Sequence, residues 1–393
     1  MSSLVLTQAR IVDVGSGVVA PGAVRIVDGR IAEVGPAVAP RPGEQHVDAA
    51  GKYVIPGLVT VHTHLSIVFP FSDTDEHEDP DTTLARARTR AQEALRVGAT
   101  TVRCIHEQHR VDLTVRALAA ETADRTVPRI VAGGRALSVP GGHGQGTGSV
   151  YCSGPEQFYA AAMDELDAGA DHVKIFITGG LAHAGESPAE PEMSRAEMAA
   201  VVRAAAEHGT YVVAHAGHHT AIREALDAGV TSFEHAYEVD EQTADLLAQP
   251  GIFVSPTLIV SSSQATMRAL GFEQHSRDNA RRAAPTHLRS IRRLVAAGVC
   301  ITHGTDYPPG QQVEGVSAVA TEAMLLQSAG LSPLQVLQAA TTNGARLVGL
   351  QDSIGAIQPG YAADLVLLDA DPTADAAALA RVHSVINGGH LVT

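Results

Sequence analysis

From residue 54 to residue 302 the sequence alternates eight times between a short apolar run rich in β-branched residues and a longer segment with helical periodicity. Strands connected in succession through helices form parallel sheets, because each helix carries the chain back to the edge where the strand before it began. Eight such units predict an α/β chain folded as a (β/α)8 barrel. The expected strands are 54–65, 100–105, 129–132, 172–177, 211–215, 232–235, 252–255 and 299–302.

The segments on either side of this region have a different pattern. Residues 3–50 form short alternating runs broken by turns, and the Asp28-Gly29 pair between two apolar runs is a strong hairpin signal. Residues 354–369 and 382–392 show the same pattern at the other end of the chain. We therefore expect both ends to pair into one small β-sandwich domain. The expected domains are a discontinuous β-sandwich of residues 1–53 and 352–393 and a hydrolase barrel of residues 54–351.

Composition restricts the class of protein and its partners. The chain has 393 residues, of which 45% are hydrophobic, and its formal net charge of −15 disfavours nucleic acids and anionic membranes as partners. It has neither a signal-peptide pattern nor a run approaching the roughly 18 apolar residues of a membrane span, so a cytoplasmic location is expected. The three cysteines include no Cys-x-x-Cys pair and predict neither disulfides nor a thiolate metal site. The sequence leaves open whether the chain forms a homo-oligomer.

Polar residues cluster at the predicted ends of the strands, where the active site of a barrel forms. His62 and His64 lie two residues apart and therefore point to the same face of a strand. A lone His-x-His pair is a weak signal, because buried histidines are often hydrogen-bonded core residues. The full set at this edge is His62, His64, Lys174, His215, His235 and Asp306. Four histidines, an acid and a lysine converging on one face predict a metal centre.

Lys174 stands out because lysine is rare here. Only Lys52 and Lys174 among the 28 basic residues are lysine. A protonated amine cannot ligate a metal, but an amine that has taken up carbon dioxide is a carbamate, which can bridge two cations; arginine cannot react in this way. Two interpretations stay open. Either carboxylated Lys174 bridges two divalent ions, for which imidazole and carboxylate ligands favour Zn²⁺, or unmodified Lys174 pairs with Asp306 beside one metal.

Several stretches resemble the amidohydrolase superfamily, within the group of imidazolonepropionase-like enzymes and prolidase-type dipeptidases. They are 56–64 (Pro-Gly-Leu-Val-Thr-Val-His-Thr-His), 173–175, 215, 234–236, 304–306, 341–345 and 355–365. The resemblance covers essentially the whole chain and implies a metal-dependent hydrolase acting on a carbon–nitrogen bond. It implies one metal on His62, His64 and Asp306, a second on His215 and His235, and carboxylated Lys174 with a hydroxide between the two metals.

The same resemblance implies a catalytic role for Asp306, while the positions of His143 and Tyr237 in the sequence make them candidates for contact with the substrate. Asp306 would act as general base and acid, taking a proton from the hydroxide and passing it to the leaving nitrogen. His143, in a glycine-rich loop after the third strand, is a catalytic and substrate-binding candidate for a carbonyl or carboxylate; a hydrogen bond that only stabilises the loop explains it equally well. Tyr237 would bind a substrate carboxylate or merely cover the site.

Residues close to His215 bear on its surroundings. His218 and His219 begin a predicted helix and are expected to cap it or to support His215 rather than to bind metal. Relatives often carry a histidine near the position of Gly217, so its absence here leaves the support of His215 open.

The substrate is the least constrained feature. With no tryptophan and 4% aromatic residues, a pocket for large flat ligands is not favoured. The prolidase-like branch implies an N-acyl amino acid or a Xaa-Pro dipeptide. The alternatives are a cyclic amide of the imidazolonepropionase kind, or a xenobiotic amide, carbamate or urea. A one-metal deaminase would not need Lys174, and a silent metal-binding scaffold would not need Asp306.

Overall fold

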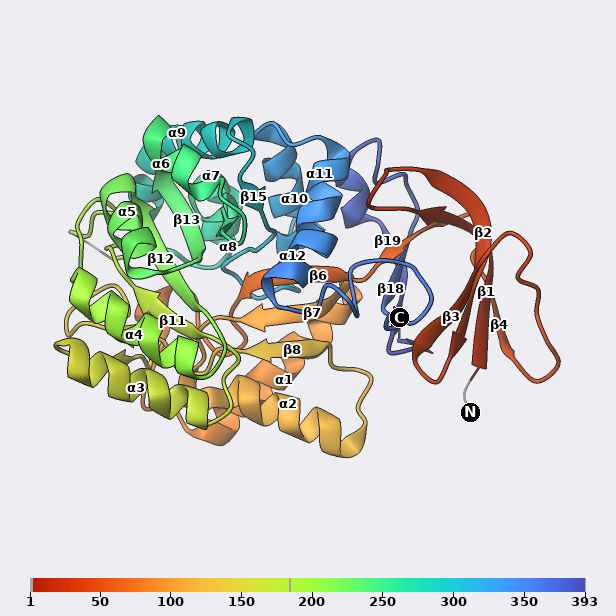
Figure 1. The fold of residues 1–393 in the computed structure, drawn as a ribbon, viewed down its shortest axis with the longest axis horizontal. Coiled ribbons are helices and arrows are strands. Elements are labelled where there is room, and N and C mark those ends of the chain that lie inside the picture. Colours follow the sequence, from red (N-terminus) through yellow and green to blue (C-terminus); the bar gives the residue numbers. More distant parts are fainter. Residues whose placement is uncertain (1–2, 184, 393) are drawn as a thin grey trace.

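The computed structural model describes residues 3–183 and 185–392 and has the predicted α/β architecture with parallel sheets (Figure 1). All eight predicted strands are present in this part of the chain. They are β6 (Leu58–Thr63), β7 (Ala99–Cys104), β8 (Arg129–Ala132), β11 (Val173–Phe176), β12 (Val212–His218), β13 (Ser232–Glu238), β14 (Phe253–Ser255) and β15 (Cys300–Ile301).

These strands lie in two parallel sheets. Within the described residues, β6, β7 and β8 form one sheet, and the other contains β11 to β15 together with the short strands β9 (Leu137–Ser138) and β10 (Val150–Tyr151). Backbone hydrogen bonds connect the two sheets on both sides. Val61 donates to the carbonyl of His303 after β15 (2.8 Å), and Asp171 before β11 donates to Ala132 of β8 (2.7 Å). The carboxyl ends of all eight strands therefore face one side of the molecule.

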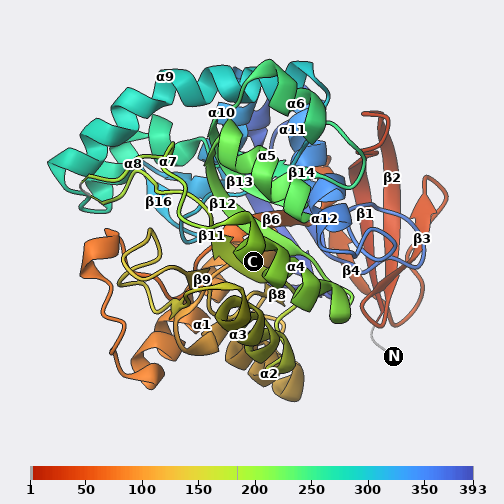
Figure 2. The ribbon, with the colours of Figure 1, turned by 60° about the vertical axis from the view of Figure 1, so that its left-hand side comes forward.

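Helices cover the outside of these strands, as the two views show together (Figures 1 and 2). The helices between the strands are α1 (Pro80–Arg96), α2 (Val111–Thr122), α3 (Pro155–Asp167), α4 (Arg195–Glu207), α5 (His219–Ala228), α6 (Glu241–Leu247), α7 (Ile259–Ser262), α8 (Gln264–Ala269) and α9 (Gln274–Ala296). After β15 come α10 (Ala318–Ser328), α11 (Pro333–Gln338) and α12 (Gly344–Leu347). None of the described helices has both the length and the apolar character needed to cross a membrane.

The two ends of the chain pair with each other, as predicted. In the described residues they form one sheet in the order β20-β19-β18-β5-β1-β2-β3, with β4 beside β1. Its strands are β1 (Ser3–Val12), β2 (Val19–Val27), β3 (Arg30–Gly35), β4 (Gln45–Asp48), β5 (Tyr53–Pro56), β18 (Leu365–Leu368), β19 (Val382–Asn387) and β20 (His390–Leu391). The predicted hairpin joins β2 and β3, and both turn residues, Asp28 and Gly29, have positive φ angles (48° and 77°), as a tight hairpin turn requires.

The expected strand 54–65 is in fact two strands in different sheets. β5 pairs with β1 and β18, whereas β6 pairs with β7. Gly57 separates them, and a Cβ atom there would lie 1.9 Å from the hydroxyl oxygen of Thr100. A side chain is thus excluded where the chain passes from one sheet to the next. The expectation of one continuous strand was wrong because an apolar run does not show which sheet its halves join.

Candidate metal centre

The six residues predicted to form the metal centre all line one cavity of about 30 Å³ at the carboxyl ends of the strands. They come from β6 and the residue that follows it (His64), from β11, β12 and β13, and from the segment after β15. The other lining residues are Phe71, His106, His143, Thr147 and Phe176. His106 was not predicted as a site residue, although its position directly after β7 could have indicated it. Tyr237 does not line this cavity but lies in an adjoining one.

Asp306 lies between the two histidines of β6. Its Oδ1 atom is 2.9 Å from Nε2 of His62 and 3.1 Å from Nε2 of His64. Burial alone would raise the pKa of Asp306, but the neighbouring His62 and His64 outweigh it and hold the pKa well below its usual range. His62, His235 and Asp306 also place potential ligand atoms within 4.8 Å of one another. Asp306 is therefore a carboxylate placed to share a cation with imidazole ligands.

The backbone is strained at this site. Asp306, His235 and Ala236 have φ angles of 63°, 67° and 55°, in the left-handed region that residues with a Cβ atom rarely adopt. Such conformations cost about 1–3 kcal/mol each and persist where the surrounding structure imposes them, most often at functional sites. Among the described non-glycine residues, His235 and Asp306 have the two largest positive φ angles.

Hydrogen bonds fix the ring orientation of the β6 histidines. Nδ1 of His62 donates to Glu234 (2.6 Å), and Nδ1 of His64 donates to the carbonyl of His106 (2.8 Å). Glu234 also accepts from the buried Arg103 (2.6 Å). Burial would raise the pKa of Glu234, but the charges of His62 and Arg103 lower it to about 2. The Nε2 atoms of both histidines are thus directed toward Asp306, and after losing a proton they would be available as ligand atoms for a metal.

The histidines of β12 and β13 are held in a similar way. Nε2 of His215 donates to the carbonyl of Gly179 (3.2 Å), and Nδ1 of His235 donates to the hydroxyl of Thr257 (2.6 Å), which itself donates to the carbonyl of Pro256. Burial lowers the pKa of both histidines well below the usual value, so both rings are neutral. Nδ1 of His215 and Nε2 of His235 are therefore free to act as ligand atoms.

Lys174 is buried in β11 with its amine facing this cavity. Among the described residues it has neither a hydrogen-bond partner nor an ion pair, and its Nζ lies 5.3 Å from the ring centre of Phe176. Burial lowers the pKa of the amine to about 8, although the charges of Glu234 and Asp306 oppose this shift. A substantial fraction of the amine is then neutral near pH 8, and this is the form that reacts with carbon dioxide. Four imidazole nitrogens, a carboxylate and such an amine fit divalent ions that prefer nitrogen and oxygen ligands.

In the sequence, Glu234 is notable only as part of the motif 234–236. In the structure it orients His62, and this role can be tested by mutation. We expect Glu234→Gln to weaken metal binding by roughly 10- to 100-fold, because the neutral amide orients His62 less firmly and leaves the charge of Arg103 unbalanced. Metal content after dialysis against a graded series of chelator concentrations measures this. Glu241→Gln, at the exposed start of α6, is the control. Equal metal retention in both variants would show that Glu234 does not support the metal centre.

His143 is held from two sides by the loop after β11. Its Nδ1 atom lies 2.8 Å from Oε2 of Glu186, and its backbone amide donates to Glu192 (2.9 Å). Its ring centre is 4.3 Å from that of His215. Burial lowers the pKa of His143, but the ion pair with Glu186 outweighs this and raises it overall. His143, His183 and Glu186 also form a second group with ligand atoms within 4.8 Å. The sequence did not indicate Glu186 or Glu192, because loop residues follow no periodicity.

Three residues near His215 in sequence or in space, His218, Gly217 and Tyr237, can be compared with their predicted roles. His218 caps α5 by accepting from the amide of Thr220 (3.4 Å), which confirms its predicted capping role. Gly217 passes so close to the next loop that a Cβ atom would lie 2.4 Å from the carbonyl oxygen of Pro188, so no histidine fits there. Tyr237 is buried and its ring is parallel to that of His235, with 5.2 Å between ring centres.

Comparison with known proteins identifies the family. Residues 53–392 match the model of the amidohydrolase family. The chain is 27% identical to the ochratoxinase of Aspergillus niger over 359 residues, covering 82% of this chain and 71% of the relative. It is 27% identical to the imidazolonepropionase of Mycolicibacterium smegmatis over 385 residues, covering 90% and 86%. A crystal structure of a prolidase in complex with N-methylphosphonate-L-proline matches with a TM-score of 0.88 and 29% identity, covering 100% of this chain and 99% of that one. The chain therefore belongs to the amidohydrolase family and is a metal-dependent hydrolase acting on carbon–nitrogen bonds.

Proposed function

We propose that this enzyme uses two metal ions to cleave an amide bond in an N-acyl amino acid or a Xaa-Pro dipeptide. The observation that carries the proposal is the donor set: four histidines, each held through one ring nitrogen by a group outside the set, surround one cavity together with the Asp306 carboxylate and the buried amine of Lys174. The similarity to the prolidase structure supports the choice of substrate, because the ligand of that protein is a proline derivative. In this proposal residues 54–351 form one (β/α)8 barrel, and residues 1–53 with 352–393 form a β-sandwich beside it.

The proposed ligands follow the geometry. His62, His64 and Asp306 would hold one metal ion, most simply Zn²⁺, and His215 and His235 would hold a second. The neutral amine of Lys174 would attack the carbon of CO₂ and lose a proton, and the resulting carbamate would supply a carboxylate ligand to the site. Bound zinc ions would polarise the scissile carbonyl and lower the pKa of a bound water to about 7.

The protein residues carry the proton and orient the substrate. Asp306 contacts the β6 histidines through Oδ1 only, which leaves Oδ2 to take a proton from the attacking water and hand it to the leaving nitrogen. The ion pair with Glu186 favours the protonated ring of His143, which then donates a hydrogen bond to the substrate carbonyl or carboxylate. Overall, one water and one amide give a carboxylic acid and an amine.

Metal content and substrate cleavage test this function together. We expect two zinc ions per chain by elemental analysis, and turnover of at least one member of a panel of N-acyl amino acids and Xaa-Pro dipeptides. Removing the metal with a chelator should abolish turnover, and zinc with bicarbonate should restore it. A preparation with two metals and no turnover on the panel would contradict the proposed substrate class, and full turnover without metal would contradict the mechanism.

A second candidate is hydrolysis of a cyclic amide. It is favoured by the similarity to imidazolonepropionase, which extends over 90% of this chain. The donor set would act in the same way on a ring amide. Including 4-imidazolone-5-propionate in the panel separates the two candidates, because only the second predicts its cleavage. Xenobiotic amides, carbamates and ureas belong in the same panel.

A further inference from the structure

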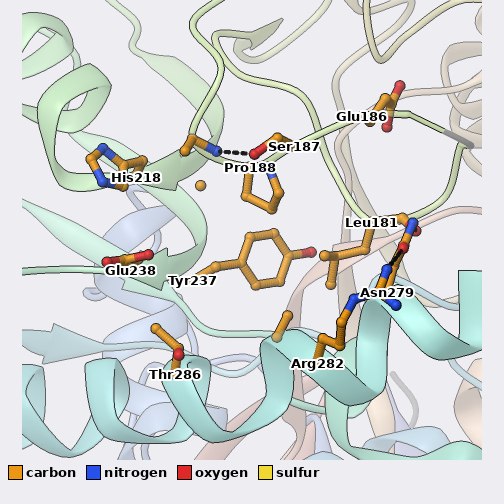
Figure 3. A pocket seen from close by; sticks show the side chains of 13 residues that line it. Leu181, Glu186, Ser187, Pro188, His218, Tyr237, Glu238, Asn279, Arg282 and Thr286 are labelled. Atoms are coloured by element: carbon orange, nitrogen blue, oxygen red, sulfur yellow. Dashed lines mark hydrogen bonds between the residues drawn. The ribbon is translucent and has the colours of Figure 1, made fainter.

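A larger pocket of about 290 Å³ lies beside the metal cavity at the carboxyl ends of β12 and β13 (Figure 3). Its walls come from the loop after β11, the ends of these two strands and one face of α9. The lining residues are Leu181, Glu186, Ser187, Pro188, Ala189, Gly217, His218, Tyr237, Glu238, Asn279, Arg282, Ala283 and Thr286. Nothing in the metal chemistry accounts for this space, which has the size of a small ligand pocket.

The pocket is continuous with the catalytic site. A cavity lined by His143, His215 and Asp306 also includes Tyr237 and Leu181, and both of these residues line the larger pocket. A substrate with its scissile bond at the metal centre can therefore extend past Tyr237 into the larger pocket. This pocket would receive the part of the substrate that takes no part in bond cleavage.

Charge is distributed unevenly in the pocket. Figure 3 shows Arg282, Asn279 and Leu181 near one end, and His218 and Glu238 near the other. Arg282 donates a hydrogen bond to the side chain of Asn279 and, among the residues that the structure describes, forms no ion pair with a carboxylate. Asn279 in turn donates to the carbonyl of Leu181 (3.3 Å). The guanidinium of Arg282 is thus held in place while its charge stays unbalanced.

The remaining polar groups favour an anion at the Arg282 end. Glu186, the acid nearest to Leu181 in Figure 3, is already paired with His143, so its charge is balanced. The hydroxyl of Tyr237 points toward the Arg282 end and has no hydrogen-bond partner in the described part of the chain. Glu238, at the opposite end, would repel an anion placed there.

We propose that Arg282 binds a free carboxylate of the substrate in this pocket, with the Tyr237 hydroxyl as a second donor. The inference rests on the proposed amide hydrolysis and adds a residue to it: Arg282 binds the carboxylate that N-acyl amino acids and Xaa-Pro dipeptides carry beyond the scissile bond. A guanidinium is suited to this role, because its planar set of donors matches the two oxygens of a carboxylate. Arg282 is a specificity residue and takes no part in the bond-breaking step.

Paired probes test this assignment. Alanyl-proline and alanyl-prolinamide, and N-acetyl-leucine and N-acetyl-leucinamide, differ within each pair only in the distal carboxylate. We expect the KM of the wild-type enzyme to be about 10-fold lower for the acid than for the carboxamide, because one charge-assisted hydrogen bond at a partly solvated site changes affinity by about this factor. The kcat values of the two probes should be similar. Arg282→Gln should raise KM for the acid by about the same factor, without a change for the carboxamide. Arg282→Glu should reverse the preference.

Arg281→Gln is the matched control. Arg281 is the neighbouring residue of α9, is 61% exposed and pairs with Asp278 (3.0 Å) rather than lining the pocket, so its loss should alter neither KM. Equal KM for acid and carboxamide in the wild type, or an equal loss on both probes in Arg282→Gln, would overturn the role of Arg282 while leaving amide hydrolysis intact. If the zinc-loaded wild type cleaves none of these probes, the proposed function is contradicted, and the carboxylate-binding role of Arg282 is rejected together with it.

Discussion

Replacing Asp306 by asparagine is expected to lower kcat by about 10²- to 10⁴-fold, the usual range for loss of a general acid–base group. Asparagine has nearly the same shape but cannot accept and return a proton, and its amide is a weaker metal ligand. Metal content should therefore be measured at excess zinc, where we expect it to remain close to that of the wild type. This separates a lost proton carrier from a lost metal.

The control for this variant is Asp227→Asn, at an exposed aspartate of α5 that forms a surface ion pair with Arg195 (3.4 Å). Its kcat should not change. An Asp306→Asn enzyme with full metal content and unchanged kcat would exclude Asp306 as the proton carrier. Loss of metal together with activity would instead limit Asp306 to a ligand role.

Replacing Lys174 by arginine is expected to remove the metal bridge and, with it, nearly all turnover. Arginine keeps a positive charge but has no amine able to form a carbamate, and its larger planar group would sit in a cavity of about 30 Å³. We expect the purified variant to hold fewer than two metals per chain. Lys52→Arg is the matched control, since Lys52 is the other lysine of the chain and pairs with Asp369 in the terminal sheet (2.6 Å).

Chemical rescue makes the carbamate hypothesis more specific. Lys174→Ala leaves room for a small acid, so formate or acetate should restore part of the second metal and of the activity by supplying the missing carboxylate. Wild-type enzyme prepared without bicarbonate should regain activity when bicarbonate is added. A Lys174→Arg enzyme with two metals and full turnover would contradict the carbamate.

The parts of the site that could be predicted from sequence follow from strand geometry. His62 and His64 share a face because side chains alternate along a strand. His215 and His235 lie at nearly the same depth in two neighbouring parallel strands, β12 and β13, so all four histidines come to one cavity. Asp306 follows the last strand and reaches the same cavity. Local pattern and the order of strands were enough to bring these groups together.

The residues that support the ligands could not be predicted in this way. Arg103 and Glu234 lie 131 positions apart and meet inside the protein only because β7 and β13 face each other across its interior. Glu186 belongs to a loop, and Arg282 is one of many polar residues of the long helix α9, so no periodicity marks either as a functional residue. Contacts across the interior depend on the tertiary arrangement of the whole chain. They cannot be predicted from the residues that surround each partner in the sequence.

The junction at Gly57 has a consequence for the order in which the protein matures during synthesis. β6, which carries the first two histidines, is separated by this one residue from β5, and β5 is hydrogen-bonded to β18 near the other end of the chain, with Pro56 opposite Leu365. The ribosome releases β18 only after the strands from β6 to β15 have been made. The first histidine pair is therefore anchored on one side by a segment translated almost last, so the centre can take up its ions only when synthesis is nearly complete. Loss of the last thirty or so residues, which include β18, would then deprive the enzyme of metal even though every proposed ligand is still encoded.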